Sequence, residues 1–254
     1  MAADLQPHRS RYWRNAKAKQ ADPEAFAAQV EPVCTAYADA PRLAALGGHV
    51  ASTDELTGIQ ALERAAPTKP PRPGCPERRE HAYIRHGTRS PIATRNVATG
   101  AILAPALRPT RTEADFAAHV AQVVDTDPDA PWLFLADNLN THQSAALVRL
   151  VATRCGLADD RGVQGQSGVL QSQASRAAFL ADPAHRIQFL YTPKQAAWLN
   201  QSELWFSILA RRVLKRGNFA SLDALRDRIR EFIAYFNQTA APFKWTYKGR
   251  PLCR

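Results

Sequence analysis

Three acidic side chains stand at positions where a metal ion could be bound. Asp54 and Asp137 each follow a short run of strand-forming residues, 47–53 and 132–136, and Glu203 is the single acid of a largely apolar helical segment. Strand ends in α/β sheets are where functional sites collect. Carboxylates that converge repel each other unless a cation lies between them, and Mg²⁺ suits oxygen ligands of this kind. The acids therefore predict a magnesium site, although an Asp after a strand is, taken singly, often only a cap or turn residue.

The segments that must position these acids alternate between strands and helices. The residues 96–100 form a turn between two strands, which predicts an antiparallel hairpin, and the proline-rich residues 67–76 are expected to form an extended basic loop. The expected strands are 47–53, 83–95, 101–106, 132–136 and 187–191. The expected helices begin at Asp22-Pro23, at Thr112, at Asn140 or Thr141, at Ser175, after Pro193 and at Ser221. The one after Pro193 is expected to be a single long helix with Trp198 in the core. This order predicts an α/β fold, a mixed sheet of about five strands flanked by helices.

The charge of the chain points to a polyanionic partner. The 254 residues carry a formal net charge of +10, which favours nucleic acid as the partner, although many basic proteins have no such partner. The four cysteines are scattered without a C-x-x-C pair, so neither a zinc site nor a disulfide framework is expected. No apolar run reaches the ~20 residues of a membrane span, and no secretory signal is seen. A cytoplasmic location with no membrane partner is the expectation.

Eight segments of the sequence, taken in order, carry a family resemblance. They are RYWRNAKA, STDELTGIQALER, ERREHAYIRHGT, NVATG, LNTHQS, SRAAFLADPAHRI, YTPKQAAWLNQSELWFSILARRVLKRGNF and PFKWTYKGRP. In this order they closely resemble the bacterial insertion-sequence transposases of the mariner-related group, which are DDE-type enzymes with a ribonuclease H-like fold. The resemblance extends from about His8 to the end of the chain.

The resemblance implies a reaction and the residues that carry it. Asp54, Asp137 and Glu203 would be the catalytic, metal-binding triad for two Mg²⁺ ions, with Mn²⁺ as a substitute. The reaction would be metal-dependent cleavage of DNA at the ends of a mobile element, followed by transfer of the free 3′ hydroxyl into target DNA. The expected partner is DNA, bound by a homodimer in a cytoplasmic, nucleoid-associated setting.

Further residues are predicted to support the triad or to contact DNA. Asn138 and His142 lie just past Asp137 and are expected to position DNA or water, although the Asn and Thr residues there could also serve only as helix caps. Asn200 shares a helical face with Glu203 and is expected to orient it. The predicted DNA-binding residues are all cationic: Lys69, Arg72, Arg78, Arg79, Lys194, Arg211, Arg212, Lys215 and Arg216. The alternatives are a solvated loop for the first four and simple compensation of the helix dipole for the last four. The basic loop lies where mariner-like relatives have a clamp that reaches across a dimer.

The predicted domains are a basic N-terminal arm and linker helix at 1–45, and a ribonuclease H-like catalytic domain at 46–254. An extension at about 156–183 lies outside the main sheet. Relatives carry helix-turn-helix domains before the catalytic domain, whereas no second helix-turn-helix pattern precedes Asp54 here. We therefore expect the catalytic half alone, with a separate helix-turn-helix polypeptide as a candidate partner. The competing hypotheses are a catalytically idle DNA-binding remnant of a mobile element and a cellular nuclease of the same fold.

Overall fold

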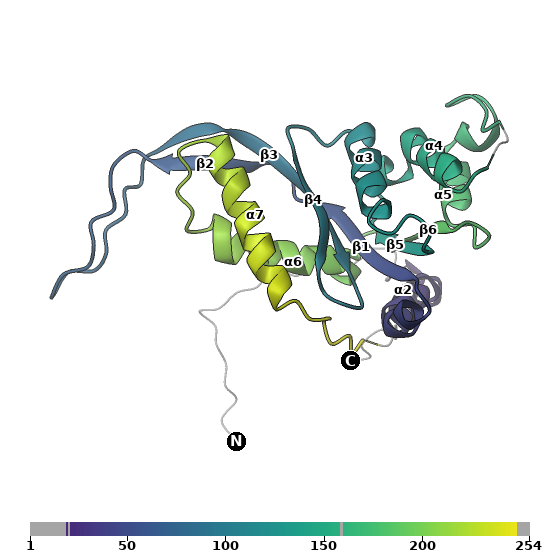
Figure 1. Ribbon diagram of the computed structural model, residues 1–254, viewed down its shortest axis with the longest axis horizontal. Helices are drawn as coiled ribbons and strands as arrows, with labels where there is room; N and C mark the ends of the chain where they lie inside the picture. Colours follow the sequence, from purple (N-terminus) through teal and green to yellow (C-terminus); the bar gives the residue numbers. More distant parts are fainter. Residues whose placement is uncertain (1–18, 20, 158–159, 248–254) are drawn as a thin grey trace, which may run out of the picture.

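A six-stranded mixed sheet runs through the middle of the molecule in the computed structural model, which describes residues 19, 21–157 and 160–247 (Figure 1). The strands are β1 (His49–Glu55), β2 (Ile59–Arg64), β3 (Tyr83–Asn96), β4 (Ile102–Arg108), β5 (Trp132–Ala136) and β6 (Ile187–Tyr191). Their order is β2-β3-β1-β5-β6, and β4 pairs with β3. The predicted α/β sheet is confirmed, with β2 as a strand that the sequence did not reveal. Most of the predicted basic arm, residues 1–18, lies outside the described residues.

The pairing of the central strands brings two of the predicted acids to one edge of the sheet. β1 pairs in parallel with β5, and β5 pairs in parallel with β6. Ser52 lies opposite Leu135 in this register. Because the register continues beyond the last pair, Asp54 comes beside Asp137, one residue past the end of β5.

Most helices begin at side-chain caps that the sequence shows. Asp22, Thr112 and Ser221 each accept a hydrogen bond from a backbone N–H in the first turn of the helix that follows, which satisfies a donor that would otherwise lack a partner. The helices are α2 (Pro23–Ala45), α3 (Glu113–Val124), α4 (Ala145–Arg154), α5 (Gln173–Leu180), α6 (Gln201–Leu209) and α7 (Leu222–Gln238). The short turns are the 3₁₀ helices η1 (Asn140–Gln143), η2 (Gly168–Leu170) and η3 (Ala197–Leu199), and the π-helical η4 (Ala210–Leu214). No helix of the described part is long and apolar enough to cross a membrane.

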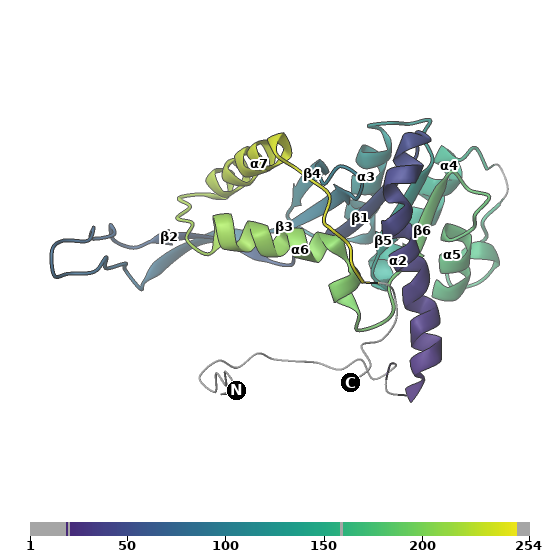
Figure 2. The ribbon, with the colours of Figure 1, turned by 90° about the horizontal axis from the view of Figure 1, so that it is seen from below.

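Helices cover both faces of the sheet (Figures 1 and 2). Successive residues of a strand face opposite sides, so Trp132 and Phe134 pack in the core shared with α3, α4 and α5, whereas Leu135 packs with α2. A third cluster joins α6 and α7 to β2, β3 and β4. The predicted extension at 156–183 supplies η2 and α5, whose Leu170 and Leu180 are fully buried in the first core.

A long arm projects from this body. It consists of β2, the first half of β3 and the residues 65–82 between them, and both views show it reaching away from the helices (Figures 1 and 2). The two limbs of its tip are joined by isolated bridges, Lys69 with Arg78 and Arg72 with Cys75. The proline-rich loop is therefore extended, as predicted, and its exposed cations lie far from the sheet centre.

The start of α6 is fastened to β1 by buried hydrogen bonds. Asn200 caps the helix; its amide donates to Oδ2 of Asp54 (2.9 Å), and its Oδ1 accepts the hydroxyl of Ser52 and the N–H of Ser202. The hydroxyl of Ser202 in turn donates to the carbonyl of Ser52 at 2.7 Å. From α2, the hydroxyl of Tyr37 donates to the carbonyl of Leu199 at 2.7 Å. These bonds fix where the first turn of α6 lies relative to the strand.

Three details differ from the prediction. The long helix after Pro193 begins only at Gln201 and ends in the π-helical η4, because Asn200 turns the chain into the helix with an extended backbone. Trp198 is 49% exposed and packs edge-on against Tyr247 instead of entering the core. After Asp137 the chain first forms η1, and α4 is capped by Ser144 rather than by the expected Asn or Thr.

Replacing the cap of α6 tests this anchor. Asn200→Ala would leave Ser52, Ser202 and Asp54 without their buried partner, so we expect the free energy of unfolding to fall by about 2–4 kcal/mol in urea denaturation. Asn218→Ala is the control, because exposed Asn218 accepts only one hydrogen bond, from Arg64 N. Equal, small losses in both variants would contradict the proposed anchoring role.

Buried His119 predicts a pH dependence of stability. Its ring hydrogen bonds with Thr94 at 2.8 Å, and burial, helped by the charge of Arg108, lowers the pKa of His119 to about 3. Between pH 6.5 and 3 the unfolded chain therefore takes up a proton that the folded chain refuses, so stability is lost as the pH falls. From pH 7 to pH 5 the wild type should lose about 2 kcal/mol more than His119→Gln. Equal losses of stability in the wild type and in His119→Gln would contradict this prediction.

Candidate active site

Asp54 is a buried carboxylate near the end of β1. It lies within the strand, not after it, and is 6% exposed. Its Oδ1 accepts the N–H of Glu55 at 2.8 Å, and its Oδ2 accepts the amide of Asn200. Burial and the charge of Asp137 raise the pKa of Asp54 to about 7, despite the opposing charge of His142. The negative charge of Asp54 is thus poorly compensated by the protein.

Asp137 is held by a histidine. Its Oδ1 lies 2.7 Å from Nδ1 of His142 and accepts the N–H of Leu139 at 2.9 Å. Burial would raise the pKa of Asp137, but the contact with His142 outweighs it and keeps this pKa below its usual value. Both contacts use Oδ1, and no described residue hydrogen bonds to Oδ2.

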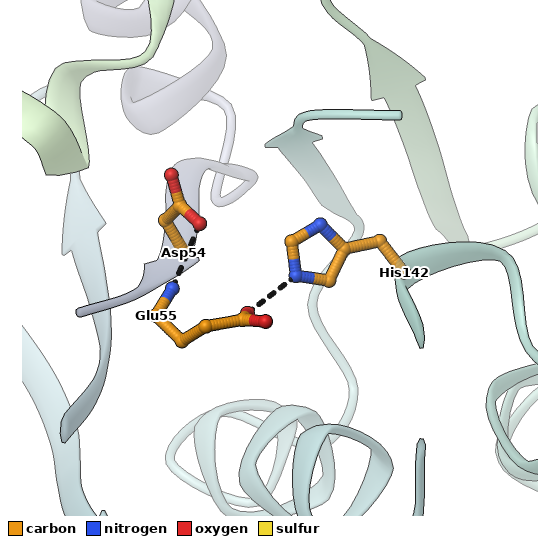
Figure 3. Close-up of side chains that lie close together, drawn as sticks. All are labelled: Asp54, Glu55 and His142. Atoms are coloured by element: carbon orange, nitrogen blue, oxygen red, sulfur yellow. Dashed lines mark hydrogen bonds and ion pairs between the residues drawn. The ribbon is translucent and has the colours of Figure 1, made fainter. Parts of the chain in front are cut away.

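His142 is fully buried in η1, where its ring packs on Phe116 at 4.1 Å between centroids. Its Nε2 lies 2.7 Å from Oε2 of Glu55, the last residue of β1 (Figure 3). Burial lowers the pKa of His142, but the carboxylates of Asp137 and Glu55 more than offset this and raise it to about 10. His142 is therefore a cation at neutral pH, placed between two acids.

Glu203 joins the site from the first turn of α6. Partial burial of its carboxylate and the charge of Asp137 raise the pKa of Glu203, and the charge of Glu203 in turn contributes to the raised pKa of Asp54. The three predicted acids thus lie within electrostatic range of one another. The group of described residues with potential ligand atoms within 4.8 Å of one another is instead Asp54, Glu55 and His142. Their role as metal ligands stays a prediction.

The other predicted supporting residues have different tasks. The expected side-chain contact of Asn200 is with Glu203, whereas in the structure its amide hydrogen bonds to Asp54. Asn138 instead ties two loops together: its amide donates to the carbonyl of Thr192, and its Oδ1 accepts from Gln143 at 2.8 Å. Buried Arg176 of α5 donates to the carbonyl of Gln143 at 2.6 Å, so the extension braces the turn that carries His142.

Glu55 is the residue that the sequence analysis missed at this site. Its side chain is 4% exposed and contacts His142 across 87 positions of sequence. A second acid directly after a strand-borne Asp was the available sign. The sequence does not show which residue will pair with this second acid.

The predicted DNA-binding residues are exposed and form two groups. Lys69, Arg72, Arg78 and Arg79 lie on the arm, and Arg211, Arg212, Lys215 and Arg216 lie along η4 and just after it, with Lys194 separately in the loop after β6. One residue of each group, Arg79 and Arg216, lines a hollow of about 750 Å³, together with Arg64 and the acids Glu63 and Glu77. No local pattern in the sequence indicates that Arg79 and Arg216 would line the same hollow.

The donor set suits a hard divalent cation. Asp54, Asp137 and Glu203 offer only carboxylate oxygens, which are the ligands that Mg²⁺ prefers. The raised pKa of Asp54 reflects negative charge that the protein leaves uncompensated, and Oδ2 of Asp137 is not engaged by the described residues. A cation among these acids would balance the charge.

Comparisons with known proteins agree with this geometry. The family model of the DDE superfamily endonucleases matches residues 49–226. Two similar solved structures are the Mos1 transposase paired-end complex with left transposon end (14% identity, TM-score 0.54, 98% of this chain and 63% of that one) and a pre-cleavage Mos1 transpososome (13%, 0.53, 97% and 63%).

A third is the Mos1 mariner paired end complex with Mn (13% identity, TM-score 0.52, 92% of this chain and 60% of that one). The chain therefore spans less than two thirds of the length of these proteins, and the likeness confirms the predicted ribonuclease H-like fold. No curated protein matches the sequence. Since the family model covers most of the chain, this protein belongs to the DDE superfamily endonucleases.

Proposed function

We propose that this chain is the catalytic domain of a DNA transposase, which cleaves phosphodiesters at the ends of a mobile element and joins the freed 3′ hydroxyl to target DNA. The observation that supports the proposal is the charge interaction among Asp54, Asp137 and Glu203, which together with burial raises the pKa of Asp54 and of Glu203. An endonuclease family model over most of the chain supports the same chemistry.

Some residues of the site would bind the metal ions, and others orient the carboxylates of these ligands. Asp54, Asp137 and Glu203 would hold two Mg²⁺ ions, or Mn²⁺ in their place. When bound, such ions activate an attacking oxygen and stabilise the leaving oxygen of a phosphodiester. Asn200 orients the carboxylate of Asp54, and His142 orients that of Asp137. Water would be the nucleophile in the first step and the 3′ hydroxyl in the second.

DNA is the proposed partner. Arg79 of the arm and Arg216, which follows η4, line one hollow, and guanidinium groups are well suited to phosphate. One similar solved structure is described as a Mos1 transposase paired-end complex with the left transposon end, which supports DNA ends as the substrate here. A homodimer on DNA, a separate helix-turn-helix polypeptide, a cytoplasmic and nucleoid-associated location, and the domain boundary at 45/46 stay predictions.

The competing hypothesis, an idle DNA-binding remnant, has less support. A remnant under no demand to turn over has no need to keep a buried Asp with a raised pKa, because such a group costs stability. Here Asp54 is buried with a raised pKa, and the amide of Asn200 hydrogen bonds to its carboxylate.

A plasmid nicking assay separates the two hypotheses. With Mg²⁺ or Mn²⁺ the wild type should nick supercoiled plasmid DNA, and EDTA should stop it. Asp137→Ala and Glu203→Gln should lower the rate about 100-fold or more, because each removes a proposed metal ligand. Glu24→Gln, an exposed acid on α2, is the matched control. If wild type and site variants behave alike, the enzyme proposal fails, and nicking confined to RNA in RNA–DNA hybrids would indicate a cellular nuclease instead.

Binding to DNA at graded salt tests the arm. A double variant, Arg72→Ala with Arg78→Ala, should bind a DNA duplex more weakly and with a shallower salt dependence, by about 0.9 in slope for each phosphate that is no longer neutralised. Arg149→Ala is the control, because Arg149 is exposed on α4, at the other end of the molecule from the arm (Figure 1). An unchanged slope in the double variant, measured by fluorescence anisotropy, would argue that the arm is only a solvated loop.

A further inference from the structure

Glu55 and His142 lie so close to Asp54 that two arrangements compete. One potential ligand atom from each of these three residues lies within 4.8 Å of the other two, a spacing that a metal ion could bridge. In one arrangement Glu55 and His142 are themselves ligands. In the other arrangement Glu55 and His142 do not bind the metal ion and instead position Asp137. The contacts of the two side chains decide between these arrangements.

His142 has no nitrogen left for a metal ion. Its Nε2 lies 2.7 Å from an oxygen of Glu55, and its Nδ1 lies 2.7 Å from an oxygen of Asp137. The Nε2 contact has hydrogen-bond geometry, whereas the Nδ1 contact is a close approach without it. An oxygen that already lies 2.7 Å from each ring nitrogen leaves no space for a cation to coordinate that nitrogen.

Glu55 has a cationic side chain of the protein near each of its oxygens. One oxygen faces His142, and the other, which is buried without a hydrogen-bond partner, lies 3.9 Å from the guanidinium of Arg111. Asp54 differs, because its oxygens accept from a backbone N–H and from the neutral amide of Asn200. As consecutive residues of a strand, Asp54 and Glu55 also face opposite sides of the sheet, and their carboxylates point in different directions (Figure 3).

We infer that Glu55 is a positioning residue: it anchors His142, which contacts Oδ1 of Asp137, so that Oδ2 would stay available to bind a metal ion. Glu55 itself is not a ligand. The inference rests on the proposed function, since it requires that Asp137 bind a divalent cation. Outer partners that orient a ligand in this way commonly change metal affinity 10–100-fold when removed.

Mn²⁺ binding to the whole metal-free chain tests this, with free Mn²⁺ followed by electron paramagnetic resonance. Glu55→Ala should raise the Mn²⁺ Kd about 10–100-fold and leave the number of ions bound at saturation unchanged. Glu55→Gln keeps an acceptor for His142, so it should restore much of the affinity. It also serves as the near-isosteric variant if the alanine variant does not fold.

Glu63→Gln is a matched control, because Glu63 makes the same contact with a histidine, His86 at 2.7 Å, but at the base of the arm. It should bind Mn²⁺ as the wild type does. Asp54→Asn shows the behaviour of a missing ligand, with fewer ions bound at saturation.

Two results would overturn the inference while the proposed function stands. Glu55→Gln could reduce the number of ions in the way that Asp54→Asn does, which would make Glu55 a ligand. Folded Glu55→Ala could bind Mn²⁺ with unchanged affinity, which would make the Glu55–His142 contact purely structural. A wild type that binds no Mn²⁺ is a different failure, since it overturns the proposed function and the inference with it.

Discussion

The geometry of the site depends on the buried side chain of Asn200, which joins the start of α6 to β1. One amide caps the helix, holds Oδ2 of Asp54 and accepts from Ser52 and Ser202. Because Glu203 lies in the first turn of that helix, the same bonds set where its carboxylate lies. A helix supported only by apolar contacts could slide along the sheet with little penalty, whereas these directional bonds permit one position.

The acids of the site are unequal, and the inequality has a physical cause. Asp137 has a cationic partner in His142, so its pKa is lowered, whereas Asp54 and Glu203 have raised pKa values, from burial first and from the charge of Asp137 next. The fold neutralises one carboxylate and leaves the others short of positive charge. Such an arrangement costs stability in the free protein and favours a divalent cation, as expected where function takes precedence over stability.

Much of the fold, but less of the site, could be predicted from the sequence. The apolar run 132–136 and the cap at Thr112 are local features, and the strand and helix they predict are present. β2 was missed because it pairs with the first half of β3 across the intervening residues 65–82, a contact that local pattern does not show. The partnership of Glu55 with His142 depends on tertiary structure, as does the exposure of Trp198, which packs on Tyr247 near the end of the described chain.

A crystal of the chain soaked in Mn²⁺ and measured at the manganese absorption edge tests the central claim most directly. We predict anomalous peaks among the carboxylates of Asp54, Asp137 and Glu203, with Oδ2 of Asp137 coordinated and Oδ1 still on His142. Density for Mn²⁺ elsewhere, or none within coordination distance of these three acids at saturating metal, would contradict the claim.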